Sequence, residues 1–190
     1  MKGVIPVKKK ILCLPLCVLF LLLTGCCLFY GGKTLEQDGL MFFPHQFRKI
    51  CFVGAYSWDA ESTEAVLSVP DSCQGYAVTK LGGSIGSGAP TPILVNVPGT
   101  KMMHGEGTLP ENAAVEDWHL TLCLGKNVRD IGLVSMNCYY NMGDNRFVQI
   151  LVTVKCDPEN RYFYSEDGKL YNREDNSPVP GFFYASDFLS

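Results

Sequence analysis

The feature that most constrains the fold of this chain is a two-residue alternation of apolar and polar side chains, repeated in short runs. Three alternating runs lie at residues 65–69, 93–97 and 120–124, and a proline or a glycine follows each. A fourth run, residues 147–154, is apolar on both faces at nearly every position. Such runs, bounded by turn residues, predict β-strands. The sequence therefore predicts a mainly β fold, with short helical pieces only within residues 37–48 and 133–140.

The N-terminal segment has the features of an export signal. Four lysines precede residues 11–32, which contain no charged side chain and include Leu23-Thr24-Gly25-Cys26. A basic start, an apolar stretch and small residues before a cleavage point are typical of a secretory signal. The residues before Cys26 resemble a bacterial lipobox. This resemblance implies that residues 1–25 are a removable signal helix and that the thiol of Cys26 carries lipid at the new N-terminus.

The alternative for this segment is an uncleaved helix that crosses the membrane, for which roughly 20 apolar residues suffice. Both interpretations place the rest of the chain outside the cytoplasm, on the extracellular face of the cell membrane. The remaining length is enough for one domain with its own core. We therefore divide the chain into a signal (residues 1–25), a tether (residues 26–50) and a β domain (residues 51–190).

The charge balance outside the signal is acidic. Four of the 16 basic residues lie in the signal, which has no acidic residue, so the 19 acidic residues outnumber the remaining basic residues by seven. An acidic surface disfavours nucleic acid and anionic lipid headgroups as partners. We therefore expect a membrane association that depends on the N-terminal anchor and no binding of nucleic acid.

The nine cysteines do not form a metal-binding pattern. Two lie in the signal, Cys26 is the lipidation residue, and no Cys-x-x-Cys pair occurs among the others. A zinc site therefore has little support. Export permits disulfides, and we expect most of these thiols to be small buried side chains with at most one disulfide. The pairing stays open among the cysteines beyond the anchor, namely Cys27, Cys51, Cys73, Cys123, Cys138 and Cys156.

Two segments echo one another: residues 78–82 (VTKLG) are similar to residues 128–132 (VRDIG), and each follows an alternating run. Here the chain resembles the BspA-type leucine-rich-repeat proteins of bacterial surfaces. The resemblance rests on residues 69–82 (VPDSCQGYAVTKLG), 122–132 (LCLGKNVRDIG) and 156–172 (CDPENRYFYSEDGKLYN). The last segment contains Asp167-Gly168, a strong turn signal for a terminal hairpin.

The resemblance implies a short, irregular leucine-rich-repeat-like solenoid or sheet, in which each coil buries its apolar face against the next. Departures from the repeat pattern occur at residues 83–90, which are rich in glycine, and at residues 102–117. The number of true coils therefore stays open. A small β-sandwich built from the same strands is the alternative fold.

Aromatic side chains of the C-terminal half are the residues that we expect to bind a ligand: Tyr139, Tyr140, Tyr162, Tyr164 and Tyr171. Exposed rings stack on sugars and anchor protein partners. With the lipobox and the repeat resemblance, they predict a membrane-tethered extracellular binding or adhesion module. Its partner is expected to be an extracellular protein or glycan, and it is expected to have no catalytic activity, no cofactor and no metal ion.

The alternative function is a cell-envelope hydrolase or its accessory subunit. It requires a concave site that brings together His104, Glu106, Asp117 or His119. These residues are the best acid–base candidates, but their spacing matches no known catalytic or metal-binding motif.

Overall fold

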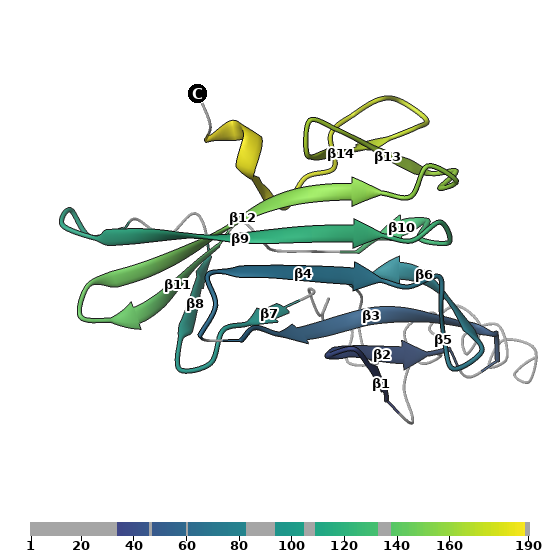
Figure 1. Cartoon of the computed structure of the whole chain (residues 1–190), viewed down its shortest axis with the longest axis horizontal. Helices are drawn as coiled ribbons and strands as arrows, with labels where there is room; N and C mark the ends of the chain where they lie inside the picture. Colours follow the sequence, from purple (N-terminus) through teal and green to yellow (C-terminus); the bar gives the residue numbers. More distant parts are fainter. Residues whose placement is uncertain are drawn as a thin grey trace, which may run out of the picture.

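Strands form most of the structure, as the alternating pattern predicts. The structure is a computed structural model that describes residues 34–45, 47–59, 61–82, 94–104, 109–132 and 138–188. Its strands form two larger sheets and one separate hairpin (Figure 1). One hydrophobic core joins them. The expected signal helix, Cys26 and the loop at residues 83–90 lie outside the described residues.

The six-stranded sheet is built around three parallel strands. Its strands, in order across the sheet, are β4 (Glu64–Val69), β9 (Ala114–Leu124), β12 (Arg146–Cys156), β11 (Cys138–Gly143) and β8 (Lys101–His104), with β15 (Phe183–Tyr184) also beside β12. The first three are parallel, whereas β11 and β8 continue the sheet antiparallel. Val69 pairs with Leu124, and Leu124 pairs with Cys156, so the three parallel strands end in one row.

The seven-stranded sheet contains the two echoing segments. Its strands are β1 (Leu35–Gln37), β2 (Leu40–Pro44), β3 (Ile50–Ser57), β6 (Tyr76–Leu81) and β10 (Asp130–Ile131), with β5 (Ser72–Cys73) beside β6 and β7 (Leu94–Asn96) beside β3. β6 and β10 pair in parallel, with Leu81 opposite Ile131. The two echoing segments therefore lie side by side.

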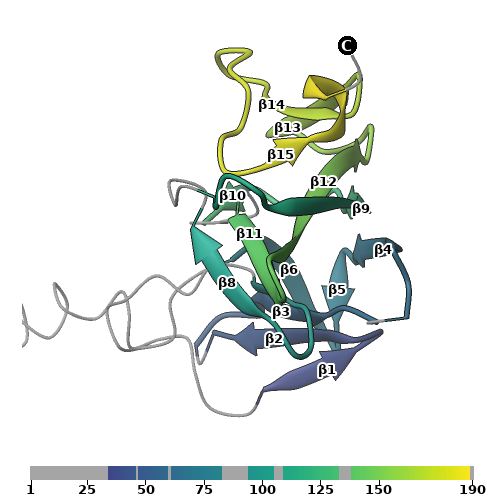
Figure 2. The same ribbon diagram turned by 90° about the vertical axis from the view of Figure 1, so that its left-hand side faces the viewer.

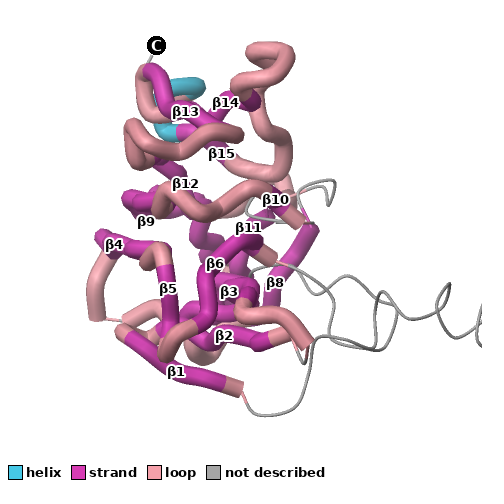
Figure 3. Tube along the Cα trace, turned by 90° about the vertical axis from the view of Figure 1, so that its right-hand side faces the viewer, coloured by secondary structure: helices cyan, strands magenta, loops and turns pink. Residues whose placement is uncertain are grey.

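Hairpins occupy the two ends of the stack of strands (Figures 2 and 3). β1 and β2 form one hairpin, and β13 (Phe163–Glu166) and β14 (Lys169–Asn172) form the other. The turn of the second hairpin is Asp167-Gly168, with φ angles of 48° and 77°. Two central residues with positive φ are the mark of the tight type I′ hairpin turn. The turn expected at this position is therefore confirmed.

The core is made of inward side chains that repeat from strand to strand. Leu67, Leu122 and Val154 form one row across β4, β9 and β12, and each is only 2% exposed. Burying a side chain of this size stabilises the fold by roughly 1.5–3 kcal/mol. β10 approaches β6 closely at Gly132, where a Cβ atom would lie 2.8 Å from the carbonyl oxygen of Gly82. A side chain at this position would push the two segments apart.

The structure confirms the four predicted strands, which correspond to β4, β7, β9 and β12. The expected helical pieces are wrong where the structure describes them. Residues 138–140 belong to β11, and residues 37–44 contain the end of β1 and all of β2. The chain turns back at Asp38-Gly39, where both φ angles are positive, so it forms a hairpin instead of a helix.

The folded domain also begins earlier than the sequence suggests. Leu35, Leu40 and Phe42, which the sequence places in the tether, belong to the hydrophobic core, and Phe42 is completely buried. Their strands pair with one another and with β3. The boundary at residue 51 is therefore corrected to a position at or before Leu35.

Candidate functional site

Two equivalent turns follow β9 and β12, which end side by side at Leu124 and Cys156. Because Leu124 pairs with Cys156, residues 125–129 and 157–161 leave the sheet side by side. Both turns close in the same way: the backbone N–H of Val128 donates to the carbonyl of Gly125, and that of Asn160 donates to Asp157. Arg129 and Arg161 are the last residues of these turns, so they occupy matching positions on neighbouring turns.

Asn160 ties the two turns together. Its side chain is 2% exposed, and its amide nitrogen donates to the carbonyl oxygens of Gly125 and Val128, each at 2.9 Å. Its amide oxygen accepts from the backbone N–H groups of Tyr162 and Phe163, also at 2.9 Å. All four hydrogen-bonding positions of the side-chain amide are filled. This one side chain therefore fixes the path of the chain on both turns.

A groove runs across the outside of these turns toward the β13–β14 hairpin. It consists of two hollows with volumes of about 570 Å³ and 290 Å³ that share Arg129, Arg161 and Tyr162. We call it the basic groove because its charged residues are four cations and two carboxylates. These are Lys126, Arg129, Arg161 and Arg173, with Glu159 and Glu174.

Most of the positive charge in the basic groove is not neutralised by the protein. Lys126 is the exception, because its Nζ lies 3.0 Å from Glu159. This hydrogen bond and the attraction of Glu159 raise the pKa of Lys126. No acidic side chain in the part of the chain that the structure describes forms an ion pair with Arg129, Arg161 or Arg173. The groove therefore presents guanidinium groups without acidic partners to a ligand.

Arg173 is held in position by the protein. Its Nε donates to the carbonyl oxygens of Asn160 at 2.8 Å and Phe163 at 3.0 Å. Its guanidinium lies 5.5 Å from the centre of the Tyr164 ring, and Tyr164 stacks on Tyr171 across the hairpin with ring centres 5.3 Å apart. This cation–π contact and the two hydrogen bonds orient Arg173 beside the groove before any ligand arrives.

Three of the five candidate tyrosines lie at the basic groove, and the other two lie elsewhere. Tyr162 is 48% exposed and lines the basic groove, while Tyr164 and Tyr171 are half-buried next to it. Tyr139 lies elsewhere, half-buried against Phe183 on the antiparallel side of the sheet.

Tyr140 requires a correction. It is only 3% exposed, and its hydroxyl donates to the backbone oxygen of Val95 at 2.8 Å. Its hydroxyl is thus satisfied inside the protein, and its ring has almost no surface to offer. Tyr140 is therefore a residue of the core rather than a surface contact.

The residues proposed for a hydrolase do not converge. Asp117 and His119 lie on the exposed face of β9. His104 lies on β8, and β12 and β11 separate β8 from β9, which puts the backbones roughly 14 Å apart. Glu106 lies outside the described residues. Within the ranges that the structure describes, no three histidine, cysteine or acidic side chains are placed to hold a metal ion.

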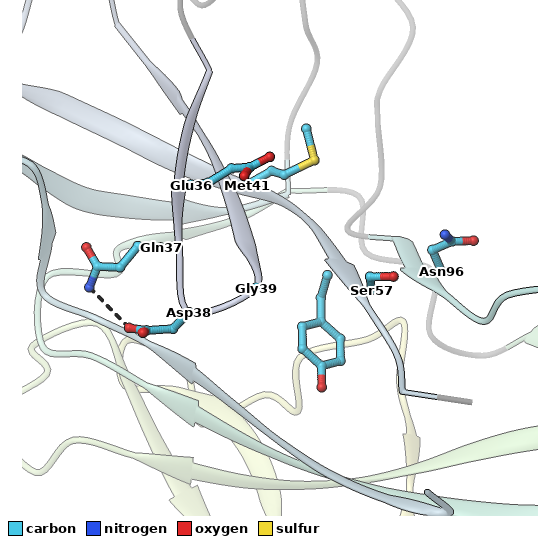
Figure 4. Close-up of a pocket in the computed structure, with 8 residues that line it drawn as sticks. Glu36, Gln37, Asp38, Gly39, Met41, Ser57 and Asn96 are labelled. Carbon is cyan, nitrogen blue, oxygen red and sulfur yellow. Dashed lines mark hydrogen bonds between the residues drawn. The ribbon is translucent and has the colours of Figure 1, made fainter. Parts of the chain in front are cut away.

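A separate hollow lies beside the β1–β2 hairpin, with a volume of about 440 Å³ (Figure 4). Its lining includes Glu36, Met41 and Asn96, and Gln37 turns toward Asp38, with the amide nitrogen 3.3 Å from the carboxylate. The two acidic side chains are exposed, and among the described residues no hydrogen bond joins either of them to the hydroxyl of Ser57 or Tyr56, which also line the hollow. This hollow has fewer features of a binding site than the basic groove.

The described cysteines form no disulfide. Cys51, Cys73 and Cys138 are buried, and Cys123 and Cys156 are half-buried. Most are small core side chains, as the sequence predicts. Burial raises the pKa of Cys51 to about 12 and that of Cys156 to about 11.

These raised pKa values predict slow alkylation of the folded chain. At pH 8 we expect iodoacetamide to modify Cys51 at least about 100-fold more slowly in the folded chain than in urea, because only the thiolate reacts. Peptide mass spectrometry over time measures both rates, with the half-buried Cys123 as internal comparison. Equal rates with and without urea would contradict the burial.

The raised pKa of Cys51 also predicts how the free energy of unfolding depends on pH. Because the folded chain holds the Cys51 proton more tightly than the unfolded chain, this free energy should fall as the pH rises from about 9 toward 12.

The sequence did not single out the arginines of the basic groove. Their positions follow from the register of β9 and β12, which places residues 129 and 161 five positions beyond a shared row. Aligning the two repeat-like segments at Leu124 and Cys156 is the signal that finds them. The acidic overall charge conceals this local basic surface.

Known proteins offer no guide to function here. No family model, curated protein or solved structure matches the chain. Among the described residues, no helix is long and apolar enough to cross a membrane. The geometry of the basic groove and the sequence are therefore the basis for a function.

Proposed function

We propose that the chain is an extracellular binding module, tethered to the cell membrane by lipid on Cys26, that recognises a surface protein or glycan and catalyses no reaction. The observation that carries this proposal is the basic groove, where unpaired guanidinium groups lie beside the exposed ring of Tyr162. Arginine and tyrosine are the residue types that dominate binding energy at recognition surfaces. The groove contains no nucleophile activated by a neighbouring base, which favours binding over catalysis.

We further propose that the domain is a short, irregular solenoid of the BspA-type leucine-rich-repeat kind. The in-register parallel pairing of β4, β9 and β12 supports this, as does the parallel pairing of β6 with β10. Stacked coils pair equivalent strands in parallel, whereas the strands of β-sandwiches are mostly antiparallel. The hairpins at the two ends correspond to the terminal caps that a solenoid requires.

The position of the groove suits a tethered module. The tether enters at β1, at one end of the stack, and the basic groove extends toward the β13–β14 hairpin at the other end (Figure 2). A lipid on Cys26 would therefore hold the β1–β2 end nearest the membrane. The groove would face outward, where a ligand from another surface can reach it.

The test displays the full chain on bacterial cells and measures binding of the cells to a glycan array and to immobilised fibronectin, laminin and mucin. We expect the double variant R129A/R161A to lose at least about tenfold in binding, since each lost charged contact is worth about 1.5–3 kcal/mol. The control variant K101A/R146A removes the same charge from exposed positions outside the groove. It should bind as the parent chain does.

The anchor is tested in the same cells. The variant Cys26→Ser should leave the protein without acyl groups and cut its binding to the cell envelope, as intact-mass analysis of the membrane fraction reports. A mature mass that begins at Met1 without acyl groups would rule out the lipid anchor. Equal binding by R129A/R161A and the parent chain would rule out the groove as the binding site.

A further inference from the structure

The basic groove has a composition that selects among ligands. Three guanidinium groups without acidic partners line one continuous surface, and Arg129 and Arg161 occupy neighbouring turns. Neighbouring parallel strands lie about 4.8 Å apart, so turns stacked on them bring like charges close together. Two adjacent cations repel one another until an anion bridges them. The arrangement therefore favours a ligand that carries several negative groups.

Guanidinium groups restrict the chemistry of those negative groups. The planar fork of arginine matches the paired oxygens of a carboxylate, a sulfate or a phosphate. Arg173 is already oriented, because its Nε bonds to two backbone oxygens and leaves the terminal nitrogens for a ligand. The groove is thus suited to oxyanions arranged along a chain.

The backbone of the groove leaves little for a peptide to pair with. The N–H of Arg129 donates to Thr79, and the N–H of Arg173 donates to Tyr162. The N–H groups of Tyr162 and Phe163 donate to the side chain of Asn160. An extended peptide that adds to a sheet depends on free main-chain donors and acceptors. Recognition in the groove therefore relies on side chains.

Tyr162 adds an apolar surface to the charged one. Its ring is 48% exposed and lines both hollows of the groove, between the charges of the turns and the β13–β14 hairpin. An aromatic face packs against the C–H face of a sugar ring, while the phenol hydroxyl stays in water. A ring beside a row of guanidinium groups fits a chain that alternates sugar rings with acidic groups.

We propose that the basic groove binds an acidic polysaccharide, with Arg129, Arg161 and Arg173 on its oxyanions and Tyr162 against a sugar ring. This inference rests on the proposed binding function and names its ligand class. Glu159 and Glu174, which also line the groove, repel the oxyanions. The ion pair between Lys126 and Glu159 opens when an oxyanion replaces Glu159 beside Lys126. These two carboxylates limit binding to the path that the arginines define.

The test measures binding of the detergent-solubilised full chain to four polymers by biolayer interferometry. Polygalacturonate carries carboxylates, dextran sulfate carries sulfates, unmodified dextran is neutral, and poly-L-glutamate is an acidic peptide. We expect an acidic polysaccharide to bind and dextran not to bind. We also expect polygalacturonate or dextran sulfate to bind at least about tenfold more tightly than poly-L-glutamate, because only the sugars use Tyr162.

Four variants separate the groove from general charge. R129A/R161A should weaken binding of the acidic polysaccharide by at least about tenfold, and K101A/R146A should change it by less than about twofold. Tyr162→Ala should weaken binding further than Tyr162→Phe, which keeps the ring. Binding by polygalacturonate alone identifies carboxylate as the preferred group, and binding by dextran sulfate alone identifies sulfate.

The outcomes that overturn the inference are distinct from those that overturn the proposed function. Binding of neither acidic polysaccharide removes the polysaccharide as the ligand, and an equal loss in K101A/R146A removes the basic groove as its site. Tighter binding of poly-L-glutamate than of the sugars assigns the groove to an acidic protein instead. In each case the binding function survives if cells that display the parent chain still bind a surface ligand that cells with R129A/R161A do not.

Discussion

Replacing Asn160 by alanine is expected to lower the free energy of unfolding by roughly 3–5 kcal/mol. The substitution removes a buried amide whose two donors and two acceptor sites are all in use. Two carbonyls and two N–H groups would lose these bonds in a region that water enters only with difficulty. Each buried polar group without a partner costs roughly 1–3 kcal/mol, and local relaxation recovers part of that sum.

Two variants check this interpretation of Asn160. Asn160→Asp keeps an oxygen for Tyr162 and Phe163 but loses the donors to Gly125 and Val128, so it should also destabilise the fold. Asn127→Ala is the matched control, because Asn127 lies on the same surface and its amide makes an exposed hydrogen bond to Asp71. It should cost less than about 0.5 kcal/mol. Urea unfolding followed by tryptophan fluorescence measures all three, and a loss below about 1 kcal/mol in Asn160→Ala would contradict the argument.

The same side chain links stability to the binding site. Arg173 is oriented in part by the backbone oxygen of Asn160, and both turns of the basic groove are joined by the Asn160 amide. A variant that remains folded but loosens these turns should therefore bind more weakly. The groove depends on an interior hydrogen-bond network as well as on its surface charges.

The strands were predictable where a strong local signal specifies them. Alternating side chains marked β4 and β9, and Asp167-Gly168 marked the β13–β14 turn. The first hairpin was missed although Asp38-Gly39 has the same turn chemistry, with φ angles of 52° and 75°. Its strands are too short for alternation to be read reliably. They are stabilised by pairing with β3, which is a tertiary effect.

The basic groove was less predictable because it depends on register. Arg129 and Arg161 are separated by more than thirty positions in the chain, and their proximity follows from the pairing of Leu124 with Cys156. The aromatic composition and the strand alternation that predict the candidate tyrosines do not distinguish the exposed Tyr162 from the buried Tyr140. Alternation in a strand predicts opposite faces, but it does not say which face is covered.

Replacing Trp118 by alanine is expected to destabilise the fold by roughly 3–5 kcal/mol, the usual cost of emptying a large aromatic site in a core. Trp118 is 4% exposed and Trp58 is 2% exposed, and their ring centres lie 5.5 Å apart. Trp58 lies just beyond the end of β3, whereas Trp118 is on β9, so the pair joins the two sheets of the domain. A cavity here would weaken the contact between the sheets rather than one strand alone.

Hydrogen bonds from the indole nitrogens orient the rings of Trp58 and Trp118, which apolar contact alone would not do. Trp58 donates to the carbonyl of Ser62 at 2.7 Å, and Trp118 donates to Glu116 at 3.0 Å. Trp118→Phe keeps a ring but loses this donor, so we expect a cost of about half that of Trp118→Ala. Val115→Ala, an exposed change on the same strand, should cost less than about 0.5 kcal/mol. Urea unfolding measured by far-ultraviolet circular dichroism compares the three without relying on tryptophan emission. If Trp118→Ala and Val115→Ala have equal midpoints, the two sheets are not held together by this aromatic pair.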